Sequence, residues 1–400
     1  MKGKEMSITK KMEGFIEKSS WIRKMFEEGA RLKGLYGAEN VFDFSLGNPN
    51  VPPPEAFGKT LEAVAADNPE MIHGYMPNPG YPDVRAKVAA QVSLEQGMTV
   101  TADEILMTCG AAGGLNVILK SILEPGDEVV TPAPYFVEYN FYADNHGGSV
   151  KVVKTKPDFT LDLAAIEAGI CDRTRAVLIN SPNNPTGQIY SRESLEALGR
   201  MLDQKSAALG RTLYLISDEP YRKITYEGLE VPGVFPCYRN TLVTTSYSKD
   251  LSLAGERIGY VAICPAADAR DRLMAGMALA NRILGFVNAP ALMQRVVGQL
   301  QGVTVDIGEY ARKRSLLCDG LREAGYEFTL PAGAFYLFPK SPIADDVAFV
   351  RLLQEEKVLA VPGSGFGGPG HFRLSFCVSD ATITGAMPGF KRAMEKSRSL

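Results

Sequence analysis

The stretch SYSKDLSLAGERIGY, residues 246–260, contains a lysine that could act as a nucleophile. Lys249 stands among small hydroxyl residues after an apolar run, and Arg257 follows it in the same stretch. A lysine at the end of a strand is commonly a solvated surface charge. A lysine amine that is partly desolvated can instead form an imine with a carbonyl group. The local sequence leaves both interpretations open.

Other polar residues follow apolar runs in the same way. RAVLIN leads into SPNNPTG, which contains Asn184, and TLYLIS leads into DEPY, which contains Asp218 and Tyr221. Each residue alone has an ordinary structural interpretation, because Asp218 could cap a helix and Tyr221 could fill a core. In open α/β sheets, however, ligands bind beyond the carboxyl ends of the strands. If these strands are parallel, we expect the three side chains and Lys249 to project into one crevice.

The segment CGAAGG, residues 109–114, indicates an anion site. It follows the apolar run EILMT and opens an amphipathic stretch. Small residues at a helix N-terminus let backbone N–H groups approach a phosphate, and the helix dipole favours the negative charge. Glycine-rich turns are also common structural punctuation, so this loop alone is weak evidence. Side chains that could bind the same anion are those of Ser246, Ser248 and Arg257.

Short apolar runs alternate with amphipathic stretches from about residue 82 onward, and this order predicts the fold class. The runs are EILMT, DEVVTP, SVKVVK, RAVLIN, TLYLIS, TLVTTS and IGYVAIC. They are continuously apolar rather than alternating, as expected for strands that are covered on both faces. Strands that alternate with helices predict an α/β fold with a mainly parallel central sheet wrapped by helices.

The two ends of the chain lack the regular alternation of apolar runs and amphipathic stretches found in its middle. Apolar residues recur at a helical spacing over residues 11–36, and Gly37 can end that helix. A proline-rich connector, LGNPNVPPPEAF, follows. After about residue 285 come a long helical region, short strands and a final helix with Asp380 as the expected N-cap. We therefore expect an N-terminal segment (1–50) that joins the small domain, a large domain (51–285) and a small C-terminal α+β domain (286–400).

The composition excludes several classes of function. With 45% hydrophobic residues, 22% charged residues and a formal charge of −3, the chain is typical of a globular protein. No basic run indicates nucleic acid, and no apolar run approaches the roughly 20 residues that span a bilayer. The N-terminus lacks an apolar signal core, so we expect a cytoplasmic protein that does not bind membranes. Six scattered cysteines and three histidines indicate neither a metal site nor a disulfide framework.

An imine-forming amine, a carboxylate for a pyridine nitrogen and a phosphate cradle together suit pyridoxal 5'-phosphate (PLP). SPNNPTG, SDEPY and SYSKDLSLAGERIGY, with GYMPNPGYPDVR and FRLSF on either side, resemble in order and spacing the motifs of the class I/II aminotransferases. These are PLP enzymes of fold type I, similar to aspartate aminotransferase. The resemblance covers almost the whole chain and implies that the large domain binds PLP.

The resemblance implies catalytic roles for three residues. Lys249 would hold PLP as a Schiff base and, once released by the substrate, would move the proton. Asp218 would pair with the pyridine nitrogen, and Tyr221 and Asn184 would bind the phenolic oxygen of the ring. The other cofactor-binding residues that it implies are Gly110, Ala111, Ala112, Phe136, Ser246, Ser248 and Arg257, with Tyr75 reaching the phosphate of a neighbouring subunit. Tyr135 is the alternative to Phe136 as the aromatic residue that stacks on the ring.

The resemblance also implies how substrates bind. Arg373 would hold the substrate α-carboxylate, with Asn184 and the backbone near Gly47 beside it. The other interpretation of Arg373 is a strand arginine paired with a structural carboxylate. Relatives often carry a hydroxyl residue or a lysine at the position of Ala112, and alanine can replace neither. The resemblance further implies cis peptide bonds before Pro134 and Pro185 and a homodimer with shared active sites.

The function expected from these residues is amino transfer between an L-amino acid and a 2-oxo acid, with 2-oxoglutarate the expected acceptor, in two half-reactions. The alternative is a PLP-dependent lyase on the same fold, either a C–S β-lyase or a cyclase of S-adenosylmethionine. A ligand-sensing regulator would need a DNA-binding domain, and only about 40 residues precede LGNPN, which is short for a domain. The sequence does not identify the amino donor.

Overall fold

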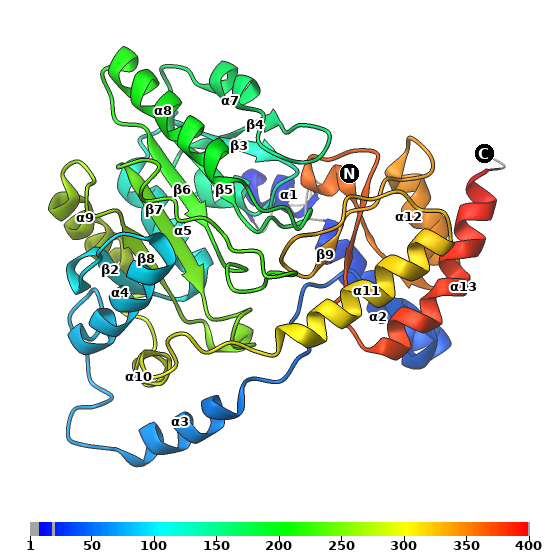
Figure 1. Cartoon of the computed structure of the whole chain (residues 1–400), viewed down its shortest axis with the longest axis horizontal. Coiled ribbons are helices and arrows are strands. Elements are labelled where there is room, and N and C mark those ends of the chain that lie inside the picture. The colour runs from blue at the N-terminus through cyan, green and yellow to red at the C-terminus, as the bar shows by residue number, and fades with distance from the viewer. Residues whose placement is uncertain (1–7, 18–20, 399–400) are drawn as a thin grey trace, which may run out of the picture.

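The computed structural model describes residues 8–17 and 21–398. In this part of the chain a seven-stranded sheet forms the centre of the larger of two bodies, with strand order β2-β8-β7-β6-β5-β3-β4 (Figure 1). Its strands are β2 (Ile105–Thr108), β3 (Glu128–Ala133), β4 (Ser149–Lys154), β5 (Thr174–Asn180), β6 (Tyr214–Asp218), β7 (Thr241–Ser246) and β8 (Gly259–Ile263). Neighbours from β4 through β7 are parallel, whereas β8 is antiparallel to both β2 and β7. The predicted α/β class with a mainly parallel sheet is confirmed.

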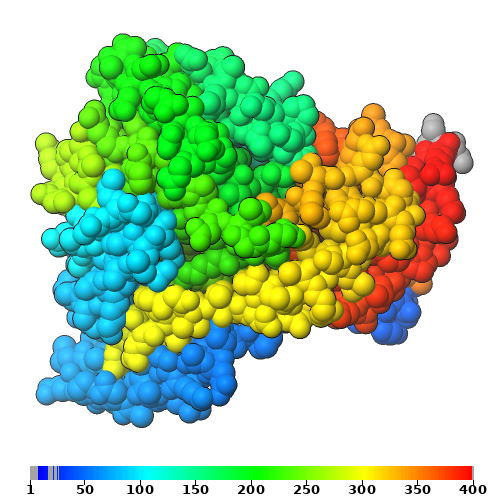
Figure 2. Space-filling model, in the orientation of Figure 1, coloured from blue at the N-terminus to red at the C-terminus, as the bar shows by residue number. Residues whose placement is uncertain are grey.

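Helices surround this sheet. They are α3 (Glu55–Ala66), α4 (Pro82–Gln96), α5 (Gly110–Ile122), α6 (Tyr139–Asp144), α7 (Leu163–Gly169), α8 (Arg192–Leu209), α9 (Arg270–Ile283) and α10 (Ala291–Gly298). The residues of β5, β6 and β8 are almost all buried, which explains why their sequences are continuously apolar. α5 packs on β7 and β8, and α7 packs on β3 and β4. Figure 2 shows the segment with α3 along one edge of the molecule, against the segment that contains α10.

The smaller body contains short strands and long helices. Strands β11 (Val361–Pro362), β12 (Phe372–Ser375) and β9 (Tyr336–Leu337) form an antiparallel sheet, and β1 (Phe42–Asp43) pairs with β10 (Val358–Leu359). Its helices are α11 (Ile307–Glu323), α12 (Asp346–Glu355) and α13 (Asp380–Ser397). α2 (Trp21–Tyr36) contacts β11, so this part of the N-terminal segment lies in the smaller body (Figure 1).

The ends of the predicted helices differ in two places. The single helix expected over 11–36 is described as α1 (Lys10–Glu17) and α2, on either side of residues 18–20, which lie outside the described residues. The N-cap of α13 is Ser379 rather than Asp380, because the Ser379 side chain accepts a hydrogen bond from the backbone N–H of Thr382 at 3.1 Å. Serine and aspartate are equally good caps, so composition alone could not choose between adjacent residues.

The two bodies have separate hydrophobic cores. One extends along the chain from Val64 to Leu300, beyond the domain boundary predicted at residue 285. The other joins N-terminal residues such as Met25 and Phe44 to C-terminal ones as far as Met394. Short 3-10 helices occur at Ala38–Asn40, Ala102–Glu104, Ala254–Glu256 and Gly363–Phe366. None of the described helices has both the length and the apolar character needed to cross a bilayer.

Candidate active site

A cavity of about 290 Å³ collects most of the predicted site residues. Its walls come from the carboxyl ends of the central strands, from the start of α5 and from the smaller body. The lining residues are Gly47, Ala111, Ala112, Leu115, Phe136, Tyr142, Asn180, Asn184, Asp218, Pro220, Tyr221, Ser246, Ser248, Lys249, Ala254, Arg257, Tyr336 and Arg373. Of the predicted residues, Gly110 and Tyr75 are outside this lining.

Strand register brings these side chains together. In the parallel pair β5–β6, Asn180 lies opposite Asp218, and in β6–β7, Asp218 lies opposite Thr244. Because the three strands end at nearly the same level, the segments that follow them converge at one edge of the sheet. The parallel arrangement on which the predicted crevice depended is therefore present.

Asp218 presents one carboxylate oxygen without a partner. The Tyr139 hydroxyl donates a hydrogen bond to Oδ2 at 2.6 Å, whereas Oδ1 is buried with no hydrogen-bond partner among the described residues. Burial raises the pKa of Asp218 to about 7; the hydrogen bond from Tyr139 opposes that rise, and the charge of Glu219 adds to it. A buried oxygen of this kind can accept a hydrogen bond from a protonated ring nitrogen of a ligand.

Lys249 is poised as a nucleophile. Its Nζ donates to the backbone oxygen of Gly47 at 2.8 Å and lies 5.4 Å from the centre of the Phe335 ring. Burial lowers the pKa of Lys249 to about 8, with Arg373 and Arg257 acting in the same direction and Cys377 opposing them. The amine is therefore closer to its neutral, reactive form than a surface lysine is.

The beginning of α5 can hold an anion. Gly110 opens the helix with φ of 70°, and a Cβ at this position would lie 3.1 Å from a guanidinium nitrogen of Arg257. A Cβ at Gly259 would lie 2.3 Å from the Thr245 backbone oxygen and 3.0 Å from the Gly110 Cα, so glycine allows these backbones to meet. Ala111 and the two serines of the cavity complete a cradle of N–H, hydroxyl and guanidinium donors.

Arg373 reaches the cavity from β12. Its guanidinium is 2% exposed and donates to Asn184 Oδ1 at 3.1 Å and to the Ser45 backbone oxygen at 2.5 Å. Its Nε has no hydrogen-bond partner, and no carboxylate within the described ranges forms an ion pair with it. The interpretation as a structural ion pair therefore has no carboxylate to support it. An unpaired buried guanidinium suits the carboxylate of a ligand.

Tyr336 belongs to this site and was missed in the sequence. Its hydroxyl lies 3.0 Å from that of Tyr221, and its ring lies 4.7 Å from the Arg373 guanidinium carbon. A Cβ at Gly47 would lie 1.8 Å from the Tyr336 hydroxyl oxygen, so only glycine leaves room for this tyrosine. The segment AGAFYLFP indicated only a strand, because nothing local showed which residues face the cavity.

Sequence reasoning missed two other residues of the site. Tyr139 was overlooked although it lies in PAPYFVEY, the same stretch that supplied Phe136. Asn180 lines the cavity, donates to the Asp218 backbone oxygen at 2.8 Å and accepts from the Asn184 N–H at 2.7 Å. It is the last residue of RAVLIN, so its position at a strand end was the available signal.

The structure also bears on the predicted stacking residue, on the predicted cis peptide bonds and on Tyr75. Phe136 lines the cavity, whereas Tyr135 is buried beside it, and its hydroxyl accepts a hydrogen bond from Asn140. The peptide bonds before Pro134 and Pro185 are cis as predicted, and the bond before Pro182 is cis as well. Tyr75 is 92% exposed and makes no contribution to the cavity of its own chain.

The donors and acceptors of the cavity fit one kind of ligand. The unpartnered Asp218 oxygen suits a ring N–H, the Lys249 amine suits an aldehyde, and the start of α5 with Arg257 suits a phosphate. The free donors of Arg373 suit a carboxylate at the opposite side. A phosphorylated pyridine aldehyde together with an amino acid would satisfy all four.

Comparisons with known proteins agree with this geometry. The family model of class I and II aminotransferases matches residues 39–388. An aspartate/prephenate aminotransferase of Thermus thermophilus is 33% identical over 330 residues, 81% of this chain and 84% of the relative. An aspartate aminotransferase of Thermotoga maritima is 32% identical over 379 residues, covering 92% and 95%.

Solved structures show the same likeness. An aminotransferase from Eubacterium rectale has a TM-score of 0.94 and 40% sequence identity, with 98% of this chain and 99% of that chain covered. The aspartate aminotransferase of Thermus thermophilus with maleate has a TM-score of 0.84 and 28% identity, with 97% and 100% covered.

Proposed function

Because the chain belongs to the class I and II aminotransferases, we propose that it moves an amino group between an L-amino acid and a 2-oxo acid with PLP as its cofactor. The observation that carries this proposal is one cavity that holds a buried carboxylate oxygen, a buried guanidinium nitrogen and an amine of lowered pKa. The first two have no partner among the described residues. The enzyme has the fold of the aspartate aminotransferases, fold type I.

Residues of the cavity would hold PLP in one orientation. Lys249 would bond to its aldehyde, Asp218 Oδ1 would accept from its ring nitrogen, and Phe136 would cover its ring. The amides at the start of α5, with Ser246, Ser248 and Arg257, would bind its phosphate. When bound, PLP supplies an electron sink that makes the Cα–H of an attached amino acid acidic.

The protein's own groups would carry out proton transfer. Lys249 Nζ, once released from PLP, would take the proton from the substrate Cα and would deliver it to C4′, the aldehyde carbon of the cofactor. A pKa near the working pH makes an amine an efficient base, and burial supplies that value here. Asn184 and Tyr221 would donate to the phenolic oxygen of PLP. Tyr336 would keep the Tyr221 hydroxyl oriented, because the two hydroxyls are in hydrogen-bond contact.

Substrates would be held from the smaller body. Arg373 would bind the α-carboxylate as a fork, and Asn184, which already contacts this guanidinium, would keep it oriented. Relatives named aspartate aminotransferases support a dicarboxylate such as 2-oxoglutarate as the acceptor. Ala112 cannot bind a second carboxylate, so that group would need a donor from outside this lining.

A homodimer would complete the site. Tyr75 is a large aromatic residue with 92% of its surface exposed, in the segment between α3 and α4. If a second copy of the chain covers this ring, the Tyr75 hydroxyl of one subunit would reach the cofactor phosphate that is bound beside Arg257 in the other subunit. We expect light scattering to give the mass of a dimer and Tyr75→Phe to weaken PLP binding.

A half-reaction screen tests the proposal. Each amino acid is added to the PLP-loaded protein without an oxo acid, and the absorbance of the lysine-bound cofactor is followed as it converts to that of the amine form. Conversion by at least one amino acid, reversed by 2-oxoglutarate, is the expected result. Formation of pyruvate and ammonia without an acceptor would contradict amino transfer and indicate a lyase instead.

A further inference from the structure

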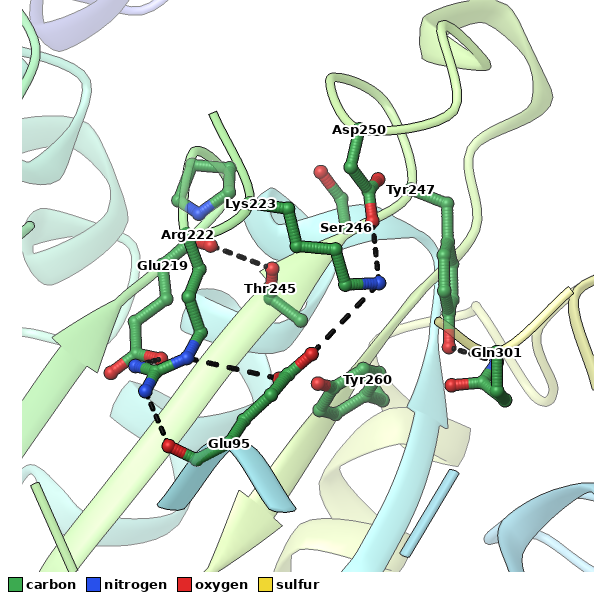
Figure 3. Close-up of a pocket in the computed structure, with 11 residues that line it drawn as sticks. Glu95, Glu219, Arg222, Lys223, Thr245, Ser246, Tyr247, Asp250, Tyr260 and Gln301 are labelled. Carbon is green, nitrogen blue, oxygen red and sulfur yellow. Dashed lines mark hydrogen bonds and ion pairs between the residues drawn. The ribbon is translucent and has the colours of Figure 1, made fainter. Parts of the chain in front are cut away.

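A second group of buried and half-buried charges surrounds a small pocket (Figure 3). We call Glu95, Glu219, Arg222, Lys223 and Asp250 the rear network. Pro220 and Ser246 line both this pocket and the active-site cavity, so the two share a wall. In the chain, Glu219 follows Asp218, Arg222 and Lys223 follow Tyr221, and Asp250 follows Lys249. Each proposed catalytic residue is therefore joined covalently to a member of the rear network.

One half of the rear network is centred on Glu219. Its Oε2 accepts from Arg222 at 2.8 Å and from Gln96 at 3.1 Å, and its Oε1 accepts from the Ser217 hydroxyl at 2.7 Å. The Arg222 guanidinium also donates to the backbone oxygen of Glu95 at the end of α4. This half fixes the end of β6 to α4.

The other half is centred on Asp250. Its Oδ2 accepts from Lys223 Nζ at 3.0 Å, and the same amine lies 3.9 Å from Glu95 Oε1. Its backbone oxygen accepts from the Val305 N–H at 2.7 Å and the Thr304 hydroxyl at 3.2 Å. The Lys223–Asp250 pair therefore ties the turn after Tyr221 to the turn that carries Lys249.

The pocket that these side chains enclose is too small to hold a metabolite. Its free volume is about 20 Å³, which is room for about one water molecule. One water would satisfy Asp250 Oδ1, which has no protein partner among the described residues. Charges around so small a space are retained either for stability or for the geometry that they impose.

We propose that Asp250 is a positioning residue, which through Lys223 holds the Lys249 turn at a fixed distance from the Tyr221 turn. The inference rests on the proposed function, because Lys249 and Tyr221 are its proposed catalytic groups. A displacement of about 1 Å between reacting groups can cost about a hundredfold in rate. An ion pair between the two turns prevents such a displacement without touching the substrate.

The test compares two substitutions of the same kind. Asp250→Asn removes the charge of the rear network and keeps the shape of the side chain. Asp127→Asn is the matched control, because both aspartate side chains are 9% exposed and each lies 3.0 Å from a basic group. Asp127 precedes β3, at the end of the sheet opposite the cavity, and its partner is Arg211.

Three quantities are measured on the PLP-loaded proteins: the melting temperature, the pH at which the absorbance of the lysine-bound cofactor titrates, and kcat with KM. Both substitutions are expected to lower the melting temperature. Only Asp250→Asn should shift the titration, by about half a unit or more, because the displaced amine has a different solvation. Only Asp250→Asn should lower kcat, by about 10- to 100-fold, with KM nearly unchanged because Arg373 is untouched.

Equal effects of Asp250→Asn and Asp127→Asn on the titration and on kcat would overturn the proposal. The Lys223–Asp250 ion pair would then only stabilise the fold. If Asp250→Asn does not fold, Lys223→Met removes the same ion pair by changing Lys223, the more exposed partner. Lys223→Arg keeps the positive charge, so it should restore most of the kcat that Lys223→Met loses. A wild-type protein that shows no lysine-bound absorbance refutes the proposed function itself, before any variant is compared.

Discussion

The active-site cavity and the rear network are two charged regions that share a wall, and they differ in how far their charged groups are paired within the protein. In the cavity, Asp218 and Arg373 each keep a polar atom without a protein partner. In the rear network, Glu219 accepts three hydrogen bonds, and Arg222 is surrounded by acceptors. Asp250 Oδ1 has no protein partner among the described residues, but the pocket beside it has room only for about one water molecule. Unpartnered buried groups cost stability unless a ligand satisfies them, whereas paired ones fix geometry. The contrast is clearest between adjacent residues: Asp218 keeps one oxygen open to the cavity, whereas Glu219 is fully paired within the protein.

The largest expected effect is on the cavity side of this comparison. Lys249→Ala removes the amine that would bond to PLP and move the proton, so turnover should be abolished while the fold remains. Activity assays with circular dichroism measure both, and borohydride reduction of the wild type should fix the cofactor on the peptide that contains Lys249. Turnover close to wild type in Lys249→Ala would refute the assignment.

Asp218→Asn should have the next largest effect. An amide cannot keep the ring nitrogen of PLP protonated by charge, so the carbanion formed at Cα loses its stabilisation. We expect kcat to fall by well over tenfold, more than about 1.4 kcal/mol of barrier. A smaller decrease would mean that Asp218 is not the partner of the ring.

Two neighbouring substitutions should change stability in opposite directions when the protein is free of cofactor. Burial raises the pKa of Asp218 above its unfolded value, so the stability it contributes is present below about pH 4 and is lost as the pH rises to about 7. Asp218→Asn should therefore raise the melting temperature at pH 8 and raise it less at pH 5. Burial raises the pKa of Glu219 as well, but Glu219→Gln should lower the melting temperature at both pH values, by the equivalent of about 3 kcal/mol of unfolding free energy, because Arg222 loses its nearest carboxylate.

Melting curves of the three cofactor-free proteins at both pH values measure this difference. The comparison between the two regions fails if Asp218→Asn and Glu219→Gln destabilise the protein equally at pH 8.

Tyr139→Phe should give the smallest effect. It removes only the hydrogen bond to Asp218 Oδ2 and leaves the ring in place against Phe136. The carboxylate can then rotate, and we expect kcat to fall about three- to tenfold, which lies within the net value of one typical hydrogen bond, about 0.5 to 1.5 kcal/mol. An unchanged kcat would show that burial alone orients Asp218.

Much of the fold could be predicted because its signals are local. The run TLVTTS coincides with β7, whose residues are almost all buried because both faces of the sheet are covered there. SVKVVK coincides with β4, but β4 is an edge strand whose residues are exposed or half-buried, so its apolar residues alternate with lysines instead of running continuously. The antiparallel direction of β8 could not be read, because an apolar run has the same composition in either direction. The choice of Ser379 over Asp380 as N-cap depended on a difference of one residue that propensity does not resolve.

The sequence by itself determined which residues could do chemistry: Lys249, Asp218, Asn184 and Arg373 stand in motifs whose order and spacing are visible in one dimension. Only the tertiary structure decided which side chains surround them. Tyr139 reaches Asp218 across 79 positions of sequence, and Tyr336 reaches Tyr221 across 115. Such contacts depend on how the sheet and the two bodies pack, and side-chain direction in a packed interior is set by neighbours that are distant in the chain. The rear network likewise becomes visible only when the segments after β6 and β7 are brought against the end of α4.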